Sequence, residues 1–146
     1  MRSRTTMIAV LPLLALLAGC GGRDRYPSSD FTPPAETARQ SLEAALNAWK
    51  EGRAPGMVEG TTPAVQVVDS QWRGGQKLDG FEVVGEDEAD GTRQYSVRLS
   101  LKAPAAAKEV RYHVIGRDPV MIYRDEDYQR MINMEDNPKP APRAGL

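Results

Sequence analysis

The stretch Tyr95-Ser96-Val97-Arg98-Leu99-Ser100-Leu101 decides the fold, because apolar and polar residues alternate along its whole length. Successive side chains of a strand point to opposite faces of a sheet. The alternation therefore predicts a strand with one face buried and the other in water, as is common in antiparallel sheets.

Further strands are predicted on both sides of this stretch. Turn-forming residues separate them, among them Gly74 and Gly75, Gly91, and Pro119. The predicted strands are residues 64–69, 81–85, 95–101, 110–115 and 120–123. Short connections favour antiparallel pairing of consecutive strands, so we expect a curved antiparallel sheet of four or five strands.

A long helix is predicted before the sheet, beginning after Thr32 and ending at Gly52. Thr32 is a suitable N-cap, and the prolines after it stand where a helix needs no amide partner. One apolar stripe follows at helical spacing: Ala38, Leu42, Ala45, Leu46 and Trp49. We expect this stripe to pack on the apolar face of the sheet, which gives an α+β roll.

This order of elements resembles the cystatin-like superfamily, which includes nuclear-transport-factor-like and ketosteroid-isomerase-like domains. The resemblance covers residues 32–127 in element order and includes no specific motif. Enzymes of that superfamily place an aspartate or a histidine in a pocket between helices and sheet. The sequence gives no residue that maps to that position, so no catalytic residue is assigned.

The N-terminus is basic at Arg2 and Arg4, and an apolar run over residues 7–18 follows that is too short to span a membrane. It closes on Leu17-Ala18-Gly19-Cys20, which resembles the lipobox of bacterial lipoprotein precursors. The resemblance implies cleavage before Cys20 and a lipid on its sulfur. It also implies that the membrane is a partner and that the location is the cell membrane or outer membrane, with the domain facing the periplasm or the exterior.

The predicted organisation follows from these boundaries. Residues 1–19 are expected to be the lipoprotein signal peptide, and residues 20–31, rich in Gly, Pro and Ser, a flexible tether. Residues 32–131 form a single α+β domain of ordinary size. Prolines alternate in the remainder, 132–146, which is expected to be a disordered tail.

Composition excludes several chemistries. Cys20 is the only cysteine, so the chain offers no internal disulfide and no thiolate metal site. The net charge is −1 and the arginines are scattered among carboxylates, which disfavours nucleic acid as a partner. We expect no cofactor and no bound metal.

Three motifs invite a chemical role. The acidic loop over residues 86–91 imitates the start of an EF-hand, but Val97 stands where the bidentate glutamate is needed, so a hairpin turn is predicted. His113 is the only histidine and is expected to be solvated or hydrogen-bonded. The charged run from Arg124 to Tyr128 is interpreted as the solvated end of the last strand.

Two classes of function remain open, with a third less favoured. The first is a non-catalytic interaction module with an envelope protein as partner. The second is a small-molecule carrier or sensor whose pocket is lined by four aromatic residues, Trp49, Trp72, Phe81 and Tyr95. The third is an isomerase-like enzyme, which needs a buried carboxylate in a cavity.

Overall fold

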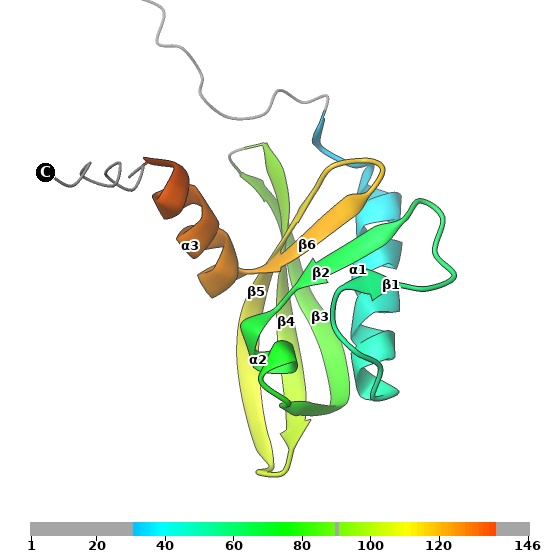
Figure 1. Ribbon diagram of the computed structural model, residues 1–146, viewed down its shortest axis with the longest axis vertical. Coiled ribbons are helices and arrows are strands. Elements are labelled where there is room, and N and C mark those ends of the chain that lie inside the picture. The colour runs from blue at the N-terminus through cyan, green and yellow to red at the C-terminus, as the bar shows by residue number, and fades with distance from the viewer. Residues whose placement is uncertain (1–30, 90, 137–146) are drawn as a thin grey trace, which may run out of the picture.

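Six strands form one curved, open sheet in the order β1-β2-β6-β5-β4-β3, and helices lie on it in an α+β arrangement (Figure 1). The computed structural model describes residues 31–89 and 91–136. The predicted signal peptide, Cys20, the tether before residue 31 and the tail after residue 136 lie outside these residues. The elements are α1 (Ala35–Lys50), β1 (Met57–Val58), β2 (Val65–Val68), α2 (Ser70–Arg73), β3 (Lys77–Ala89), β4 (Thr92–Lys102), β5 (Ala106–Ile115), β6 (Val120–Arg124) and α3 (Asp125–Asp136).

The sheet is mixed, and the prediction of an antiparallel sheet of four or five strands is wrong in this respect. Strands β3, β4, β5 and β6 are antiparallel neighbours, but β6 pairs in parallel with β2, from Val65↔Val120 to Val68↔Tyr123. The chain leaves β2 through α2 and continues in β3 at the opposite edge of the sheet. Alternation within a strand shows which residues share a face, but it does not specify the neighbouring strand.

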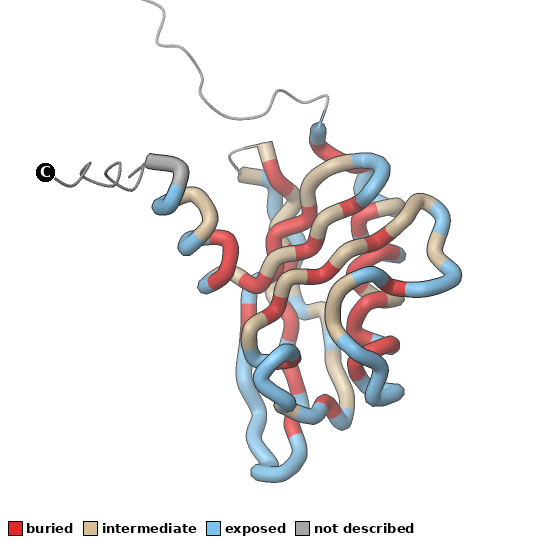
Figure 2. The backbone as a smooth tube through the Cα atoms, in the orientation of Figure 1, coloured by how far each residue is buried: buried red, intermediate tan, exposed pale blue. Residues whose placement is uncertain are grey.

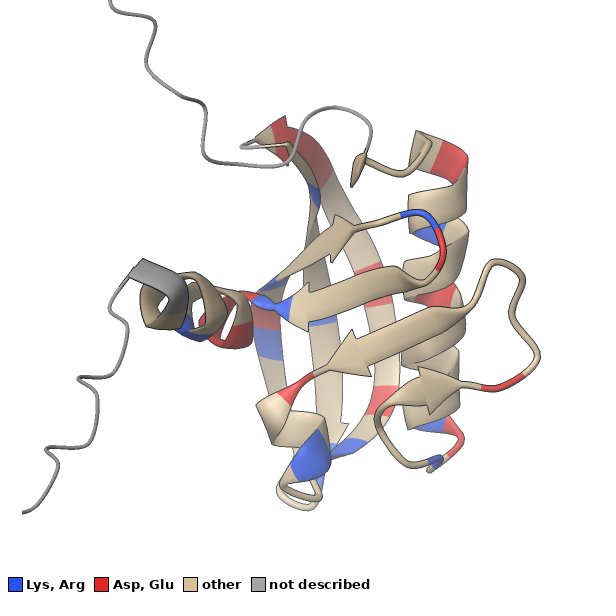
Figure 3. Cartoon of the chain, turned by 45° about the horizontal axis from the view of Figure 1, so that its top comes forward, with Lys and Arg blue, Asp and Glu red and all other residues tan. Residues whose placement is uncertain are grey.

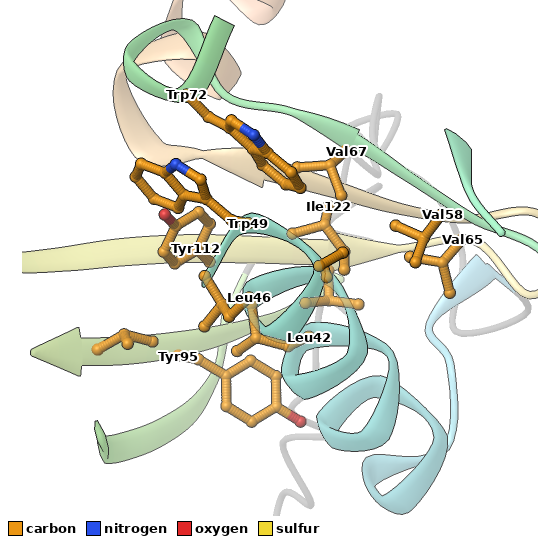
Figure 4. Packing of buried hydrophobic residues seen from close by; sticks show 14 of the residues in the cluster. Leu42, Leu46, Trp49, Val58, Val65, Val67, Trp72, Tyr95, Tyr112 and Ile122 are labelled. Carbon is orange, nitrogen blue, oxygen red and sulfur yellow. The ribbon is translucent and has the colours of Figure 1, made fainter. Parts of the chain in front are cut away.

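The core lies between α1 and one face of the sheet, which we call the inner face. All five residues of the predicted apolar stripe on α1 are buried. They meet the inward residues of β4 and β5, among them Tyr95, Val97 and Tyr112, and Ile122 of β6 (Figure 4). Figure 2 shows that burial is concentrated where α1 faces the sheet and along the central strands.

The start of α1 differs from the prediction. The N-cap is Pro34, which supplies no side-chain bond, and the amide of Ala38 donates to its carbonyl at 2.9 Å. Thr32 is therefore not the cap. Its hydroxyl donates instead to the carbonyl of Gly91 at 2.7 Å, and this bond ties the segment before α1 to the turn between β3 and β4. Two prolines separate Thr32 from the first helical amides, so its side chain is not placed to cap them.

The charged run after β6 is a helix, which corrects the prediction of a solvated strand end. Arg124, Asp127 and Tyr128 are buried, and acidic residues occupy the first turn of α3, as the helix dipole favours. This helix lies against the face of the sheet opposite α1, which we call the outer face (Figure 1). It continues to Asp136, beyond residue 132, where the tail is predicted to begin.

Candidate functional site

A cleft of about 370 Å³ lies between α3 and the outer face of β4 and β5. The sheet supplies its floor and α3 supplies one wall. Its lining residues are Gln94, Arg111, His113, Asp125, Tyr128, Gln129 and Ile132. A second hollow of about 200 Å³ continues it along the outer face toward Gly85 and Asp87, and the two share Gln94 and Arg111.

His113 forms the floor of the cleft and is 3% exposed. Its neighbour Tyr112 faces the core, so the alternation of β5 places His113 on the outer face, under α3. The Nε2 atom lies 2.6 Å from Oδ1 of Asp125, and the ring stacks on Tyr128 at 4.1 Å between centroids. These contacts fix the imidazole between the sheet and the first turn of α3. Of the two predicted outcomes for His113, solvated or hydrogen-bonded, the structure shows the second.

The other side of the ring faces Thr92. The Thr92 Oγ1 and His113 Nδ1 atoms are 3.5 Å apart, and the Thr92 hydroxyl donates to the carbonyl of Ala89 at 3.0 Å. Thr92 is 1% exposed. Asp125, His113 and Thr92 therefore imitate the order of a catalytic triad, but the hydroxyl is buried and already engaged, so it cannot serve as a nucleophile in this arrangement.

Charge in the cleft comes from Arg111 and Asp125. Arg111 is exposed, and within the described residues it makes no ion pair and no side-chain hydrogen bond. The side chain of Asp125 is 39% exposed, and its partner among those residues is His113. Figure 3 shows acidic and basic segments side by side where α3 meets the sheet. Within the part of the chain that the structure describes, the cleft thus presents a guanidinium without an ion-pair partner and an accessible carboxylate.

A buried polar network fixes the position of α3. It forms where the parallel strands β2 and β6 end together, so that Asp69 and Arg124 are neighbours. Asp69 is 1% exposed; its Oδ1 caps α2 by accepting from the amides of Gln71 and Trp72, at 2.9 and 3.0 Å. Its Oδ2 accepts from the Tyr112 hydroxyl at 2.8 Å and lies 3.7 Å from the Arg124 guanidinium.

The network has an electrostatic consequence and a mechanical one. Burial, and then the adjacent charge of Asp69, raise the pKa of Tyr112 well above its ordinary value. A hydrogen bond links α3 to α2: the carboxylate of Asp127 accepts from the amide of Ser70 at 2.8 Å. The same carboxylate pairs with Arg130 of α3 at 2.9 Å. The wall of the cleft is therefore held by bonds that continue into the core.

Of the four predicted ligand-binding aromatic residues, three lie in the core and Phe81 packs against it; none of them lines either hollow of the outer face. Trp49 and Trp72 stack at 5.5 Å, and their indole N–H groups donate to the carbonyls of Gln76 and Arg53 at 2.7 and 2.9 Å. Tyr95 is fully buried, and Phe81 packs on the cluster while partly exposed. In the structure, all four side chains pack against other residues of the fold.

Sequence reasoning missed the cleft, although three signals for it are present. Arg111 and His113 have the outward phase of β5, and Tyr128 and Ile132 are four residues apart, the spacing of one helix face. The acidic residues at 125–127 suit the first turn of a helix. Because the charged run was interpreted as the end of a strand, the helix that forms the wall of the cleft was not predicted. The outward residues of β5 were therefore not assigned to a site.

No protein-family model and no curated protein matches this chain. Among residues 31–89 and 91–136, no three or more His, Cys, Asp or Glu side chains are grouped so that they could hold a metal ion. Within the same residues, no helix has the length and apolar character needed to cross a membrane.

Proposed function

We propose that this chain is a lipid-anchored protein of the bacterial envelope whose folded part is a non-catalytic binding module. The binding surface is the cleft between α3 and the outer face of the sheet. The observation that carries the proposal is the contrast between the two faces. The cluster around Trp49, Leu42 and Tyr95 packs on the inner face, whereas the outer face carries an open cleft whose Arg111 has no ion-pair partner among residues 31–89 and 91–136.

The anchor rests on the sequence Leu17-Ala18-Gly19-Cys20 after an apolar run. A diacylglyceryl group on Cys20 supplies two acyl chains, which is enough for stable attachment. Metabolic labelling with radioactive palmitate tests this directly: the wild-type chain takes up label, and the Cys20→Ser variant does not. Equal labelling of the two, or membrane association that survives the substitution, contradicts the anchor.

The fold proposal is a cystatin-like roll. It is supported by a 16-residue α1 whose apolar stripe crosses the inner face of a curved sheet. The parallel pair of β2 and β6, and α3 on the outer face, depart from the simple order of one helix and consecutive antiparallel strands. In such a roll a ligand pocket would lie between helix and sheet; here core side chains fill most of that space, and a hollow of about 160 Å³ remains between α1 and residues 61–65.

The chemistry of the cleft favours binding over turnover. Its histidine is held between Asp125 and Tyr128, and the nearest hydroxyl, that of Thr92, is buried. Every buried side-chain nitrogen and oxygen in the described residues has a hydrogen-bond partner, as is usual for polar groups with a structural role. One observation favours the alternative of a small-molecule carrier or sensor: the volume of the cleft, about 370 Å³, falls in the range of small-molecule sites.

Native mass spectrometry of the lipid-anchored protein, purified from its host envelope in mild detergent, tests the binding role. We expect a co-purified molecule or protein subunit that is lost in Arg111→Glu. The matched control is Arg98→Glu, since Arg98 is an exposed arginine on the same sheet face outside the cleft. Retention of the bound species in both variants, or its loss in both, contradicts a role for the cleft.

A further inference from the structure

We infer that the cleft beside α3 binds a small zwitterion of the amino-acid class, with its carboxylate on Arg111 and its ammonium group on Asp125. The inference rests on the proposed binding function and specifies its ligand. It follows from the placement of two opposite charges that face one cavity without pairing with each other.

Strand geometry places Arg111 next to the residue that contacts Asp125. Arg111 and His113 are alternate residues of β5, so their Cα atoms stand roughly 6.6 Å apart on the same face. Asp125 is held at the His113 end by the 2.6 Å contact with Nε2. The carboxylate therefore lies on the α3 wall beside His113, which is two residues along β5 from Arg111, and no ion pair joins the two charged groups in the described residues.

A zwitterion satisfies this pair better than a simple ion. A lone carboxylate on Arg111 would lie near the negative charge of Asp125, and a lone amine on Asp125 would lie near the guanidinium. Like charges brought together lower affinity, whereas complementary charges fix the orientation of a ligand. Arginine also presents paired donors that match a carboxylate in a bidentate geometry.

The remaining walls define the rest of the ligand. Ile132 and Tyr128 give α3 an apolar surface beside the charges, which suits a small aliphatic side chain. Gln94 and Gln129 add amide groups that form no hydrogen bond within the part of the chain that the structure describes. The volume of about 370 Å³ can enclose a single amino acid or a dipeptide.

Isothermal titration calorimetry of the full-length chain in detergent micelles tests the inference with a matched set of probes. Leucine is compared with 3-methylbutylamine, which lacks the carboxylate, and with 4-methylpentanoate, which lacks the ammonium group. We expect leucine to bind at least tenfold more tightly than either, the factor associated with one charge-assisted hydrogen bond. Glycerophosphoethanolamine is the fourth probe, because a lipid headgroup is another source of a zwitterion.

Three variants locate the binding. Arg111→Gln and Asp125→Asn are each expected to weaken leucine binding at least tenfold, since each removes one charge and keeps a polar side chain of similar size. Arg98→Gln, on the same face but outside the cleft, is expected to leave the affinity unchanged. Thermal melting of each variant confirms that it is folded before its titration is interpreted.

The outcomes separate this inference from the proposed function. Absence of saturable leucine binding, equal affinity for all probes, or tighter binding of glycerophosphoethanolamine overturns the amino-acid assignment. If a co-purified protein is still lost in Arg111→Glu while leucine does not bind, the binding module stands and the zwitterion inference falls. If neither a bound species nor leucine binding depends on Arg111, both proposals fail.

Discussion

Replacing Asp69 by alanine removes the centre of the buried polar network, and we expect a loss of about 3–5 kcal/mol in the free energy of unfolding. Loss of the cap on α2 accounts for about 1 kcal/mol. The Tyr112 hydroxyl, left buried without its acceptor, adds about 1–3 kcal/mol. Arg124 loses its buried carboxylate partner and retains its ion pair with the exposed Glu126, which brings the total into the range of a broken buried pair, about 3–5 kcal/mol.

Urea denaturation at pH 7, followed by circular dichroism, measures this loss. Two smaller changes divide it: Asp69→Asn keeps an acceptor for the α2 amides and removes the charge, and Tyr112→Phe removes only the hydroxyl. Each is expected to cost less than the alanine variant. Asp79→Ala is the control, because its carboxylate is exposed and its ion pair with Lys102 is long, at 3.9 Å. A loss for Asp69→Ala as small as that for Asp79→Ala would refute the reasoning.

Three further predictions address other parts of the fold. Trp49→Ala removes the stack on Trp72 and a buried indole hydrogen bond, so unfolding should become easier by about 3–5 kcal/mol, with a shift of the remaining tryptophan fluorescence to longer wavelength. Gly116→Ala should destabilise more than Gly60→Ala in thermal melting: both glycines have positive φ, +81° and +76°, but only at Gly116 would a Cβ lie 2.7 Å from a carbonyl oxygen, that of Pro119. The strain at Gly60 alone should cost about 1–2 kcal/mol, and equal losses at the two sites would contradict the steric argument. Burial and the neighbouring carboxylate of Glu86 raise the pKa of Tyr95 to about 12, above its unfolded value of 10.0, so stability should fall as pH rises from 10 to 12 and Tyr95→Phe should reduce that slope; denaturant unfolding across that range measures it.

Local sequence patterns predicted much of the fold. Alternation at residues 95–101 correctly placed Tyr95, Val97 and Leu99 on the buried face of β4, and all five stripe residues of α1 are buried. Both predictions depend on periodicity, which is set by backbone geometry and by the need to remove apolar surface from water. The α+β class follows from these two patterns together.

The pairing of the strands and the geometry of the site could not be predicted from local periodicity. The residues of β2 and β6 are equally compatible with parallel and antiparallel neighbours, and the parallel pairing involves contacts between distant segments, such as the Asp69–Arg124 pair. The helix over residues 125–136 was not predicted because its charged first turn directly follows a strand and was interpreted as the end of that strand, and because its apolar face is short. The cleft depends on that helix, so Arg111 and His113 could be placed on one strand face but not in a site.

The position of β6 between β2 and β5 has a consequence for how the chain assembles. Until residue 124 is available, the β1–β2 hairpin has no link through the sheet to the β3–β4–β5 meander, and α1 has only part of the surface on which it packs. Synthesis from the N-terminus therefore delivers the joining strand after every other strand. Because the pairing of β2 with β6 closes a long stretch of chain, its formation is entropically costly and expected to be late. A chain truncated before residue 120 should thus lose the whole sheet cooperatively, and no N-terminal half should persist as a folded fragment.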